Sequence, residues 1–150
     1  MTGAVPLGWI RVCSIIACLI GFWLAISCFF SFASGWHALA KRYRCTTTSS
    51  GRLHRFVSMG LGQGWGFPAV GYRRCLFARV DSAGILLAIL PLFRFFHPQL
   101  FIPWSAVSDC RRERLWFINY TAVYISEPQT RMIFRGRLGE EIYEARNQAA

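Results

Sequence analysis

Arginine is the residue type whose number and spacing point most clearly to chemistry in this chain. The candidate residues lie in two predicted strands and in the segment between them: Arg73, Arg74, Arg79, Arg94, Arg111, Arg112 and Arg114. The planar guanidinium donates paired hydrogen bonds that match phosphate oxygens. Beside an anionic leaflet, each basic residue adds about 1 kcal/mol of attraction. The pattern therefore predicts a face that binds anionic lipid headgroups. The alternative is that these charges only solvate exposed strands.

Residues that could support catalysis or hold a metal are scattered. The sequence has no Gly-x-Ser-x-Gly or His-Glu-x-x-His motif, and its histidines stand far apart: His37, His54 and His97. Cys110 with His97 and Asp109 could form a nucleophilic site, but a cysteine is more often a small buried residue. No pair of candidate ligands has the short spacing of a zinc site. We expect no enzyme activity, no cofactor and no metal.

Composition and charge favour a membrane protein over other basic proteins. The 150 residues are 54% hydrophobic, and 17 Lys and Arg against 7 Asp and Glu give a net charge of +10. One domain and one span fit this length. Basic chains also bind nucleic acid, but no recognition motif of that class is present, so we expect no nucleic-acid partner.

The longest uncharged stretch, residues 12–33, has the length of a membrane span. As a helix it would be about 33 Å long, enough to cross a hydrocarbon core of ~30 Å. Arg11 bounds it on one side. The sequence therefore predicts a short N-terminal tail over 1–11, a transmembrane helix over 12–34, and the lipid bilayer as a partner.

Three other interpretations of this stretch are open. A cleaved signal peptide would use Ser31, Phe32 and Ala33 as its cleavage site and Arg11 as its charged region, although its apolar part usually spans only ~7–15 residues. A buried helix of a soluble domain would need the rest of the chain to cover it on all sides. A lipoprotein would be modified at Cys28, which lies deep in the apolar run.

Basic residues close to the span set its expected orientation. Those that follow it are Lys41, Arg42, Arg44, Arg52 and Arg55, whereas Arg11 alone precedes it. The positive-inside rule therefore places the C-terminal domain in the cytoplasm. The 6 cysteines agree, because they are scattered and form no C-x-x-C pair, as is typical of reduced thiols rather than of a secreted disulfide framework.

Small residues form a stripe along the predicted span. Ala17, Gly21 and Ala25 repeat at four-residue spacing and share one helix face. Small residues let two membrane helices approach closely, so the stripe is a candidate for self-association. The alternative is that such residues are simply common in membrane helices.

The segment after the span changes character. Residues 35–69 are predicted to be a juxtamembrane linker with a possible first strand at 52–59. The run 60–66 is rich in glycine but lacks the Gly-Lys-Ser/Thr of a phosphate loop, so we expect a flexible connection there.

A small β domain with a terminal helix is predicted over 70–150. β-forming residues alternate with turn signals at 81–84 and 127–130. After Gly136, apolar residues fall at i, i+4 and i+7, the spacing of an amphipathic helix. The fold class is therefore α+β, an antiparallel β domain closed by a C-terminal helix.

Three segments within this domain carry a family resemblance: GILL (84–87), LPLFR (90–94) and PQLFIPWSAV (98–107). Over about residues 70–148 the chain resembles small bacterial membrane proteins with a pleckstrin-homology-like (PH-like) domain. The resemblance implies a single-pass protein of the bacterial inner (cytoplasmic) membrane, and its motifs are structural rather than catalytic. The sequence departs from the pattern at Ala106, where an acidic residue often follows the Trp-Ser pair.

The segment 93–98 combines aromatic residues with one arginine. We expect Phe93 and Phe95 to pack into the core, with Ile102 and Trp104 nearby also serving packing. The alternative is that the segment enters the membrane interface or contacts a partner, with Arg94 at the headgroups.

The predicted function is a non-catalytic module at the cytoplasmic membrane surface that binds anionic lipid headgroups through its arginines. The alternative is a membrane-anchored scaffold, which self-associates through its span and binds a protein partner at a sheet edge. Salt distinguishes the two, since it screens headgroup attraction but hardly affects strand pairing or helix packing.

Overall fold

The structure is a computed structural model that describes residues 7–46, 50–64 and 70–149. Its elements in chain order are α1 (Leu7–Ser34), α2 (Trp36–Tyr43), β1 (Arg52–Gln63), β2 (Val70–Val80), β3 (Gly84–Ile89), the 3-10 turn η1 (Pro91–Phe93), β4 (Leu100–Pro103), the 3-10 turn η2 (Trp104–Ala106), β5 (Val107–Leu115), β6 (Ile118–Ile125), β7 (Thr130–Arg135) and α3 (Gly136–Ala149). Parts of the predicted tail and linker lie outside the described residues: 1–6, 47–49 and 65–69.

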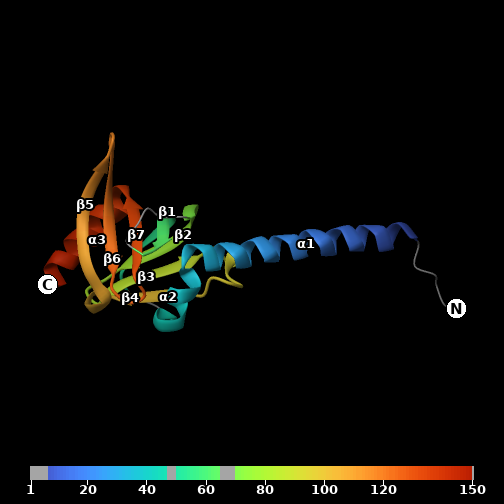
Figure 1. Cartoon of the computed structure of the whole chain (residues 1–150), viewed down its shortest axis with the longest axis horizontal. Helices are drawn as coiled ribbons and strands as arrows, with labels where there is room; N and C mark the ends of the chain where they lie inside the picture. Colours follow the sequence, from blue (N-terminus) through green and yellow to red (C-terminus); the bar gives the residue numbers. More distant parts are fainter. Residues whose placement is uncertain (1–6, 47–49, 65–69, 150) are drawn as a thin grey trace.

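α1 projects from the β domain as a single long helix, and the C-terminus of the chain lies at the opposite end of the molecule (Figure 1). Among the described residues, only Gly8–Ser34 is long and apolar enough to cross a membrane. Its side chains are exposed throughout residues 8–22, including Ile15 and Leu19. A long apolar helix that the domain leaves uncovered needs another apolar environment, so α1 is a candidate membrane span.

A single residue, Gly35, separates α1 from α2. Its φ of 85° lies in the left-handed region that favours glycine, and a Cβ there would lie 2.7 Å from Cγ of Gln63. α2 is amphipathic, with Trp36 and Leu39 completely buried and Lys41 exposed. The segment predicted as a linker thus contributes a helix to the core.

The strands form one curled antiparallel sheet of seven strands in the order β4-β3-β2-β1-β7-β6-β5. β1 to β4 and β5 to β7 are two meanders, and pairing of β1 with β7 joins them. β1 shifts register between His54 and Met59, and Phe56 within this irregularity has a φ of 56°. Such bulges increase strand twist and help the sheet curl into a half-barrel.

α3 closes the half-barrel at the end away from α1 (Figure 1). Its buried residues Leu138 and Ile142 join the core, together with fully buried side chains such as Leu61 and Phe134 from the strands. The predicted α+β architecture is therefore confirmed: an apolar N-terminal helix, an antiparallel sheet and a C-terminal helix.

The predicted flexible connection at 60–66 is wrong in its first part. Residues 60–63, predicted as part of a flexible connection, belong to β1: all four pair with β7, and Gly60 and Leu61 also pair with β2. Hydrogen bonds to the neighbouring strands hold the backbone extended, so the glycines there do not end the strand. Residues 65–66 of the same run lie outside the described residues.

Candidate functional site

A buried chain of hydrogen bonds joins the end of α1 to the β domain; we call it the junction. Ser34 Oγ lies 2.8 Å from the Tyr72 hydroxyl, which lies 3.1 Å from Nε2 of His97. Nδ1 of His97 in turn lies 3.2 Å from the carbonyl oxygen of Phe93. Trp36 packs its ring against both Tyr72 and His97. Polar and aromatic contacts together fix the orientation of the domain on α1.

Burial keeps the junction uncharged near neutral pH. It raises the pKa of Tyr72 to about 12, against the opposing effect of the hydrogen bond with Ser34. It also lowers the pKa of His97 below the ordinary value of 6.5, although the hydrogen bond with the Phe93 carbonyl works the other way. The phenol and the imidazole are therefore both neutral at pH 7, and no unpaired charge is buried.

The β3–β4 loop, residues 90–99, lies alongside α1. The ring centroids of Phe93 and Phe95 lie 5.8 and 6.3 Å from that of Trp23. Farther along the helix, Ser31 Oγ donates to the carbonyl oxygen of Phe96 at 2.6 Å. The loop thus follows α1 from its end back to Trp23.

The loop presents two apolar side chains outwards. It includes the 3-10 turn η1 near its start. Phe93 and Phe96 are half-buried, and Phe93 packs on the core as predicted. Leu92 and Phe95 are 64% and 75% exposed. The prediction that Phe95 packs into the core is wrong, because its side chain is largely exposed and its ring lies next to Trp23 of α1.

Basic residues lie near the junction along the chain, although Arg73 lies on the face of β2 opposite Tyr72, in a pocket with Tyr120 and Arg135. They lie at the end of α2, next to Tyr72 on β2, and in the β3–β4 loop; we call them the junction basic set: Lys41, Arg44, Arg73 and Arg94. All are exposed, and within the described ranges none of them forms an ion pair. The neighbouring Arg42 differs, since it pairs with Glu127. The guanidinium and ammonium groups of this set are therefore available to an external anion.

The sheet divides the predicted lipid-binding arginines into separate groups. Those close to the junction are Arg73, Arg74 and Arg94. Those on β5 are Arg111, Arg112 and Arg114. β1, β7 and β6 lie between β2 and β5, and β5 lies at the end of the domain away from α1 (Figure 1). Arg79 is close to the end of β2 farthest from Tyr72. The arginines therefore do not form one continuous face.

Local contacts occupy the arginines of β5. Arg111 pairs with Asp109 on the same strand, and Arg112 pairs with Glu140 of α3. Nε of Arg114 donates to a backbone carbonyl oxygen of the β5–β6 turn at 3.1 Å. These contacts connect the hairpin to itself and to α3, so they explain the β5 arginines without a ligand.

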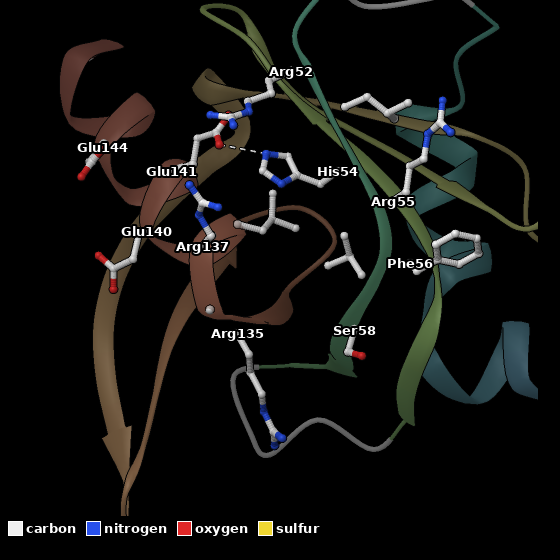
Figure 2. Close-up of a pocket in the computed structure, with 14 residues that line it drawn as sticks. Arg52, His54, Arg55, Phe56, Ser58, Arg135, Arg137, Glu140, Glu141 and Glu144 are labelled. Carbon is white, nitrogen blue, oxygen red and sulfur yellow. Dashed lines mark hydrogen bonds and ion pairs between the residues drawn. The ribbon is translucent and has the colours of Figure 1, made fainter.

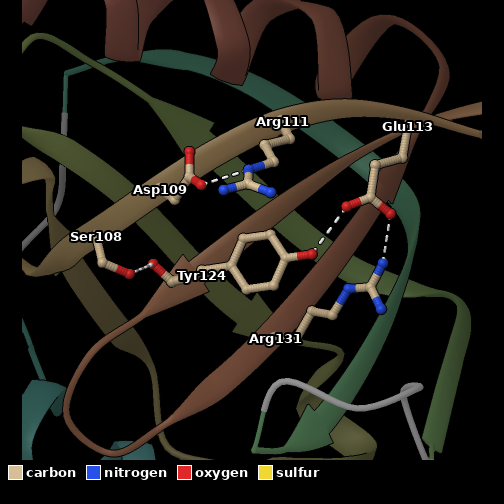
Figure 3. A network of polar contacts seen from close by, with 6 residues as sticks. All are labelled: Ser108, Asp109, Arg111, Glu113, Tyr124 and Arg131. Carbon is tan, nitrogen blue, oxygen red and sulfur yellow. Dashed lines mark hydrogen bonds and ion pairs between the residues drawn. The ribbon is translucent and has the colours of Figure 1, made fainter.

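Glu113 is the centre of a polar network on β5, β6 and β7 (Figure 3). Its carboxylate accepts hydrogen bonds from the hydroxyls of Tyr120 and Tyr124, at 2.9 and 2.8 Å, and pairs with Arg131. Burial raises the pKa of Glu113, but the tyrosine hydrogen bonds and the Arg131 charge outweigh it and bring the pKa below its ordinary value. The ionised carboxylate therefore ties three strands together, which is a structural role.

A cleft of about 890 Å³ lies between the first half of β1 and the start of α3 (Figure 2). Its basic residues are Arg52, Arg55, Arg135 and Arg137. Its acidic residues are Glu140, Glu141 and Glu144. His54 Nε2 lies 2.8 Å from a Glu141 carboxylate oxygen and partly fills the space between the two elements. Charges of both signs line this cleft, which makes it a weaker anion site than the junction.

The residues considered for catalysis do not form a reactive site. Burial raises the pKa of Cys110 to about 11, with the Asp109 charge adding to it, which is the opposite of thiol activation. His97 makes its hydrogen bonds with Tyr72 and the Phe93 backbone. Within the described ranges, no group of His, Cys, Asp and Glu side chains could hold a metal ion.

The small-residue stripe lies on an exposed side of α1. Ala17, Gly21 and Ala25 are exposed, and a Cβ at Gly21 would have nothing within 4 Å. A second helix therefore has room to approach. Self-association through this stripe stays a prediction.

The tip of the β5–β6 hairpin is a feature that the sequence patterns did not reveal. Trp116 and Phe117 are 83% and 87% exposed, and Trp116 has a φ of 57°. In tight hairpins glycine or asparagine normally occupies such a position, so no turn signal marked this one. The hairpin projects to the side of the domain rather than along α1 (Figure 1).

Comparison with known proteins adds no family: no family model matches the chain, and no curated protein matches it in sequence.

Proposed function

We propose that this is a single-pass protein of the bacterial cytoplasmic membrane, whose cytoplasmic PH-like domain binds anionic lipid headgroups through the junction basic set and performs no catalysis. The observation that carries the proposal is the buried junction of Ser34, Tyr72 and His97, which fixes the domain on the end of α1. The two meanders closed by a C-terminal helix support the PH-like assignment.

The fixed orientation decides which basic residues meet the membrane. α2 begins one residue after α1, and Arg73 follows the tyrosine that bonds to Ser34. Arg94 lies in the loop that contacts Trp23. If α1 spans the bilayer, these residues lie at the headgroups, where each contributes about 1 kcal/mol of attraction to anionic lipid. The β5 arginines lie farther away and are engaged in local contacts.

The experiment compares lipid-dependent stability of two double variants of the full chain. In zwitterionic micelles, added phosphatidylglycerol should raise the melting temperature of the unmodified protein more than added phosphatidylcholine does. Arg73→Gln with Arg94→Gln should reduce this difference, because the variant removes two guanidinium groups from the headgroup level. High salt should reduce it further, since the screening length falls to about 3 Å at 1 M.

Arg111→Gln with Arg114→Gln is the matched control. It removes the same charge from β5 and should retain the full difference between the two lipids. The proposal fails if both double variants lose the difference equally, or if the unmodified protein shows none.

A second candidate function is favoured by the hairpin tip. Trp116 and Phe117 are exposed on the side of the domain, where lipid cannot cover them if α1 is upright in the membrane. In two copies anchored in one membrane, the β5–β6 hairpin tips lie at the same distance from the bilayer. The tip therefore suits contact with a second copy, together with the stripe of Ala17, Gly21 and Ala25 on α1.

Crosslinking tests this scaffold function. With the native cysteines replaced, Phe117→Cys in the full chain should form a covalent dimer with a bifunctional maleimide in vesicles, and Gly21→Ile should lower the yield by blocking close helix approach. Ser82→Cys, exposed in the β2–β3 turn, is the control that should crosslink poorly. Equal yields at both positions would exclude the tip as a specific contact.

A further inference from the structure

The part of α1 that the domain leaves free is shorter than a bilayer core. Side chains are exposed over residues 8–22, and Trp23 is the first that the domain partly covers. That free part is about 22 Å long at 1.5 Å per residue, whereas a hydrocarbon core is about 30 Å thick and needs about 20 residues. If α1 spans, the bilayer must also surround helix that contacts the domain.

The span cannot extend far enough toward the N-terminus of α1 to reach this thickness, because Arg11 lies there. It is the only charged residue of α1, and a guanidinium deep in hydrocarbon is costly. Its side chain can reach the headgroups over about one helical turn, so the core begins between Gly8 and Val12. About 20 residues from these starting points end at Ser27 and Ser31. The core boundary on the domain side therefore lies about 6–12 Å beyond Trp23.

The β3–β4 loop lies at the level of Trp23. Phe93 and Phe95 lie next to the Trp23 ring, and Leu92 and Phe95 are the large exposed apolar side chains of the loop. On α1 itself Phe29 is also exposed, nearer to the domain than Trp23. The apolar surface thus continues from the free helix over the loop and the last turns of α1.

Part of the loop backbone is hydrogen-bonded within the loop itself. The N–H groups of Phe93, Arg94 and His97 donate to carbonyl oxygens within the loop, of Leu90, Pro91 and Arg94 respectively. Non-helical backbone is tolerated at membrane depth where protein covers it or water reaches it, and α1 covers one side of this loop through Trp23 and Ser31. The three internal hydrogen bonds further lower the cost of placing the loop below the headgroups.

We infer that the β3–β4 loop inserts into the acyl-chain layer of the domain-side leaflet, with Leu92 and Phe95 in contact with lipid chains and the Arg94 side chain extending back to the phosphates. The inference deepens the proposed function and rests on α1 being a membrane span. It makes the loop a second membrane contact that fixes the rotation and tilt of the domain.

Depth-dependent fluorescence quenching tests this insertion in the full chain. In a background without the native cysteines, single cysteines at Leu92, Ile16 and Ser82 carry an environment-sensitive fluorophore, and the protein is reconstituted in vesicles with lipids that bear a nitroxide on the acyl chain. Ile16 lies on the free helix. Ser82 lies in the β2–β3 turn, at the other end of β3 from the loop. We expect Leu92→Cys to be quenched like Ile16→Cys, with emission at shorter wavelength than Ser82→Cys.

The three labelled positions distinguish failure of the loop insertion from failure of the membrane span. Quenching at Ile16 without quenching at Leu92 overturns the inserted loop and leaves the span intact; protection of Leu92 from aqueous iodide would then indicate a protein cover. Absence of quenching at Ile16 overturns the span and with it the proposed function.

Unmodified protein provides a second measurement if the cysteine-free background does not fold. Lipids with a diazirine at the acyl-chain end should, on illumination, label peptides that contain residues 91–96 as well as α1. They should leave residues 81–83 unlabelled. Labelling confined to α1 contradicts the insertion.

Discussion

At the scale of single residues, the junction depends on an imidazole that stays neutral. His97 is buried, and its pKa lies below the ordinary value of 6.5. Below that pH the unfolded chain takes up a proton that the folded chain does not, so protonation favours unfolding. Neutral His97 therefore makes its full contribution to stability above pH 6.5. This contribution decreases as the pH falls towards the pKa of His97 in the folded state.

The pH dependence gives a direct prediction. The free energy of unfolding of the full chain in micelles should fall between pH 7.5 and 5.5, with His97 contributing up to about 1.4 kcal/mol per pH unit. His97→Gln should show a smaller fall, because glutamine can hydrogen-bond to Tyr72 without titrating. His37→Gln, outside the junction, should behave like the unmodified protein. A fall of the same size in both variants would show that His97 is not the group responsible.

The sequence could not have identified this cluster. Ser34, Tyr72 and His97 come from a helix end, a strand and a loop, and no spacing rule links them. The arginine prediction had a related limit. Residue type indicated phosphate binding, but sheet order decided that β2 and β5 lie apart, and acidic neighbours such as Asp109 and Glu140 decided which guanidinium groups are paired.

At the scale of elements, α2 belongs to the folding unit. Leu39 is completely buried, and its loss leaves a cavity in the core. Leu39→Ala should lower the free energy of unfolding by about 2–5 kcal/mol in chemical denaturation of the full chain. Lys41→Ala, on the exposed side of the same helix, should change it by less than about 0.5 kcal/mol. Similar small effects for both would mean that α2 does not pack as described.

Strong local patterns predicted most elements and failed where neighbours decide. Alternating β-forming residues and the 3.6-residue period after Gly136 marked the strands and α3. The glycines at 60 and 62 predicted a loop, but pairing with the neighbouring strands overrides that preference. The turn at Trp116 had no glycine or asparagine to reveal it, and only the paired register of β5 and β6 defines it. The Phe95 side chain could not be assigned without the position of α1.

At the scale of the whole molecule, charge is distributed unevenly along the long axis. Lys41, Arg42 and Arg44 follow α1 directly, whereas the carboxylates of α3 lie at the far end. An excess of basic residues beside a span favours retention in the cytoplasm. The domain is therefore expected inside the cell.

Reporter fusions check the orientation. A fluorescent protein at the C-terminus should be bright, and alkaline phosphatase at the same place should be inactive. Changing Lys41, Arg42 and Arg44 to glutamine should raise the phosphatase activity, because the charge difference across α1 becomes smaller. Glutamine at Arg111, Arg112 and Arg114 is the distant control and should leave both signals unchanged. High phosphatase activity in the unmodified protein would show that the orientation is opposite to the predicted one.

The single glycine between α1 and α2 has a consequence for how the protein meets its targets. A flexible tether lets a domain explore a volume that grows with tether length and presents it at millimolar effective concentration to sites within reach. Gly35 provides no such length, and a side chain there would meet Gln63. If α1 spans a membrane, the domain therefore moves only by lateral diffusion and axial rotation of the whole molecule. On the proposed function, a soluble target would have to come to the membrane to find it, and a membrane-bound target would meet it in one orientation.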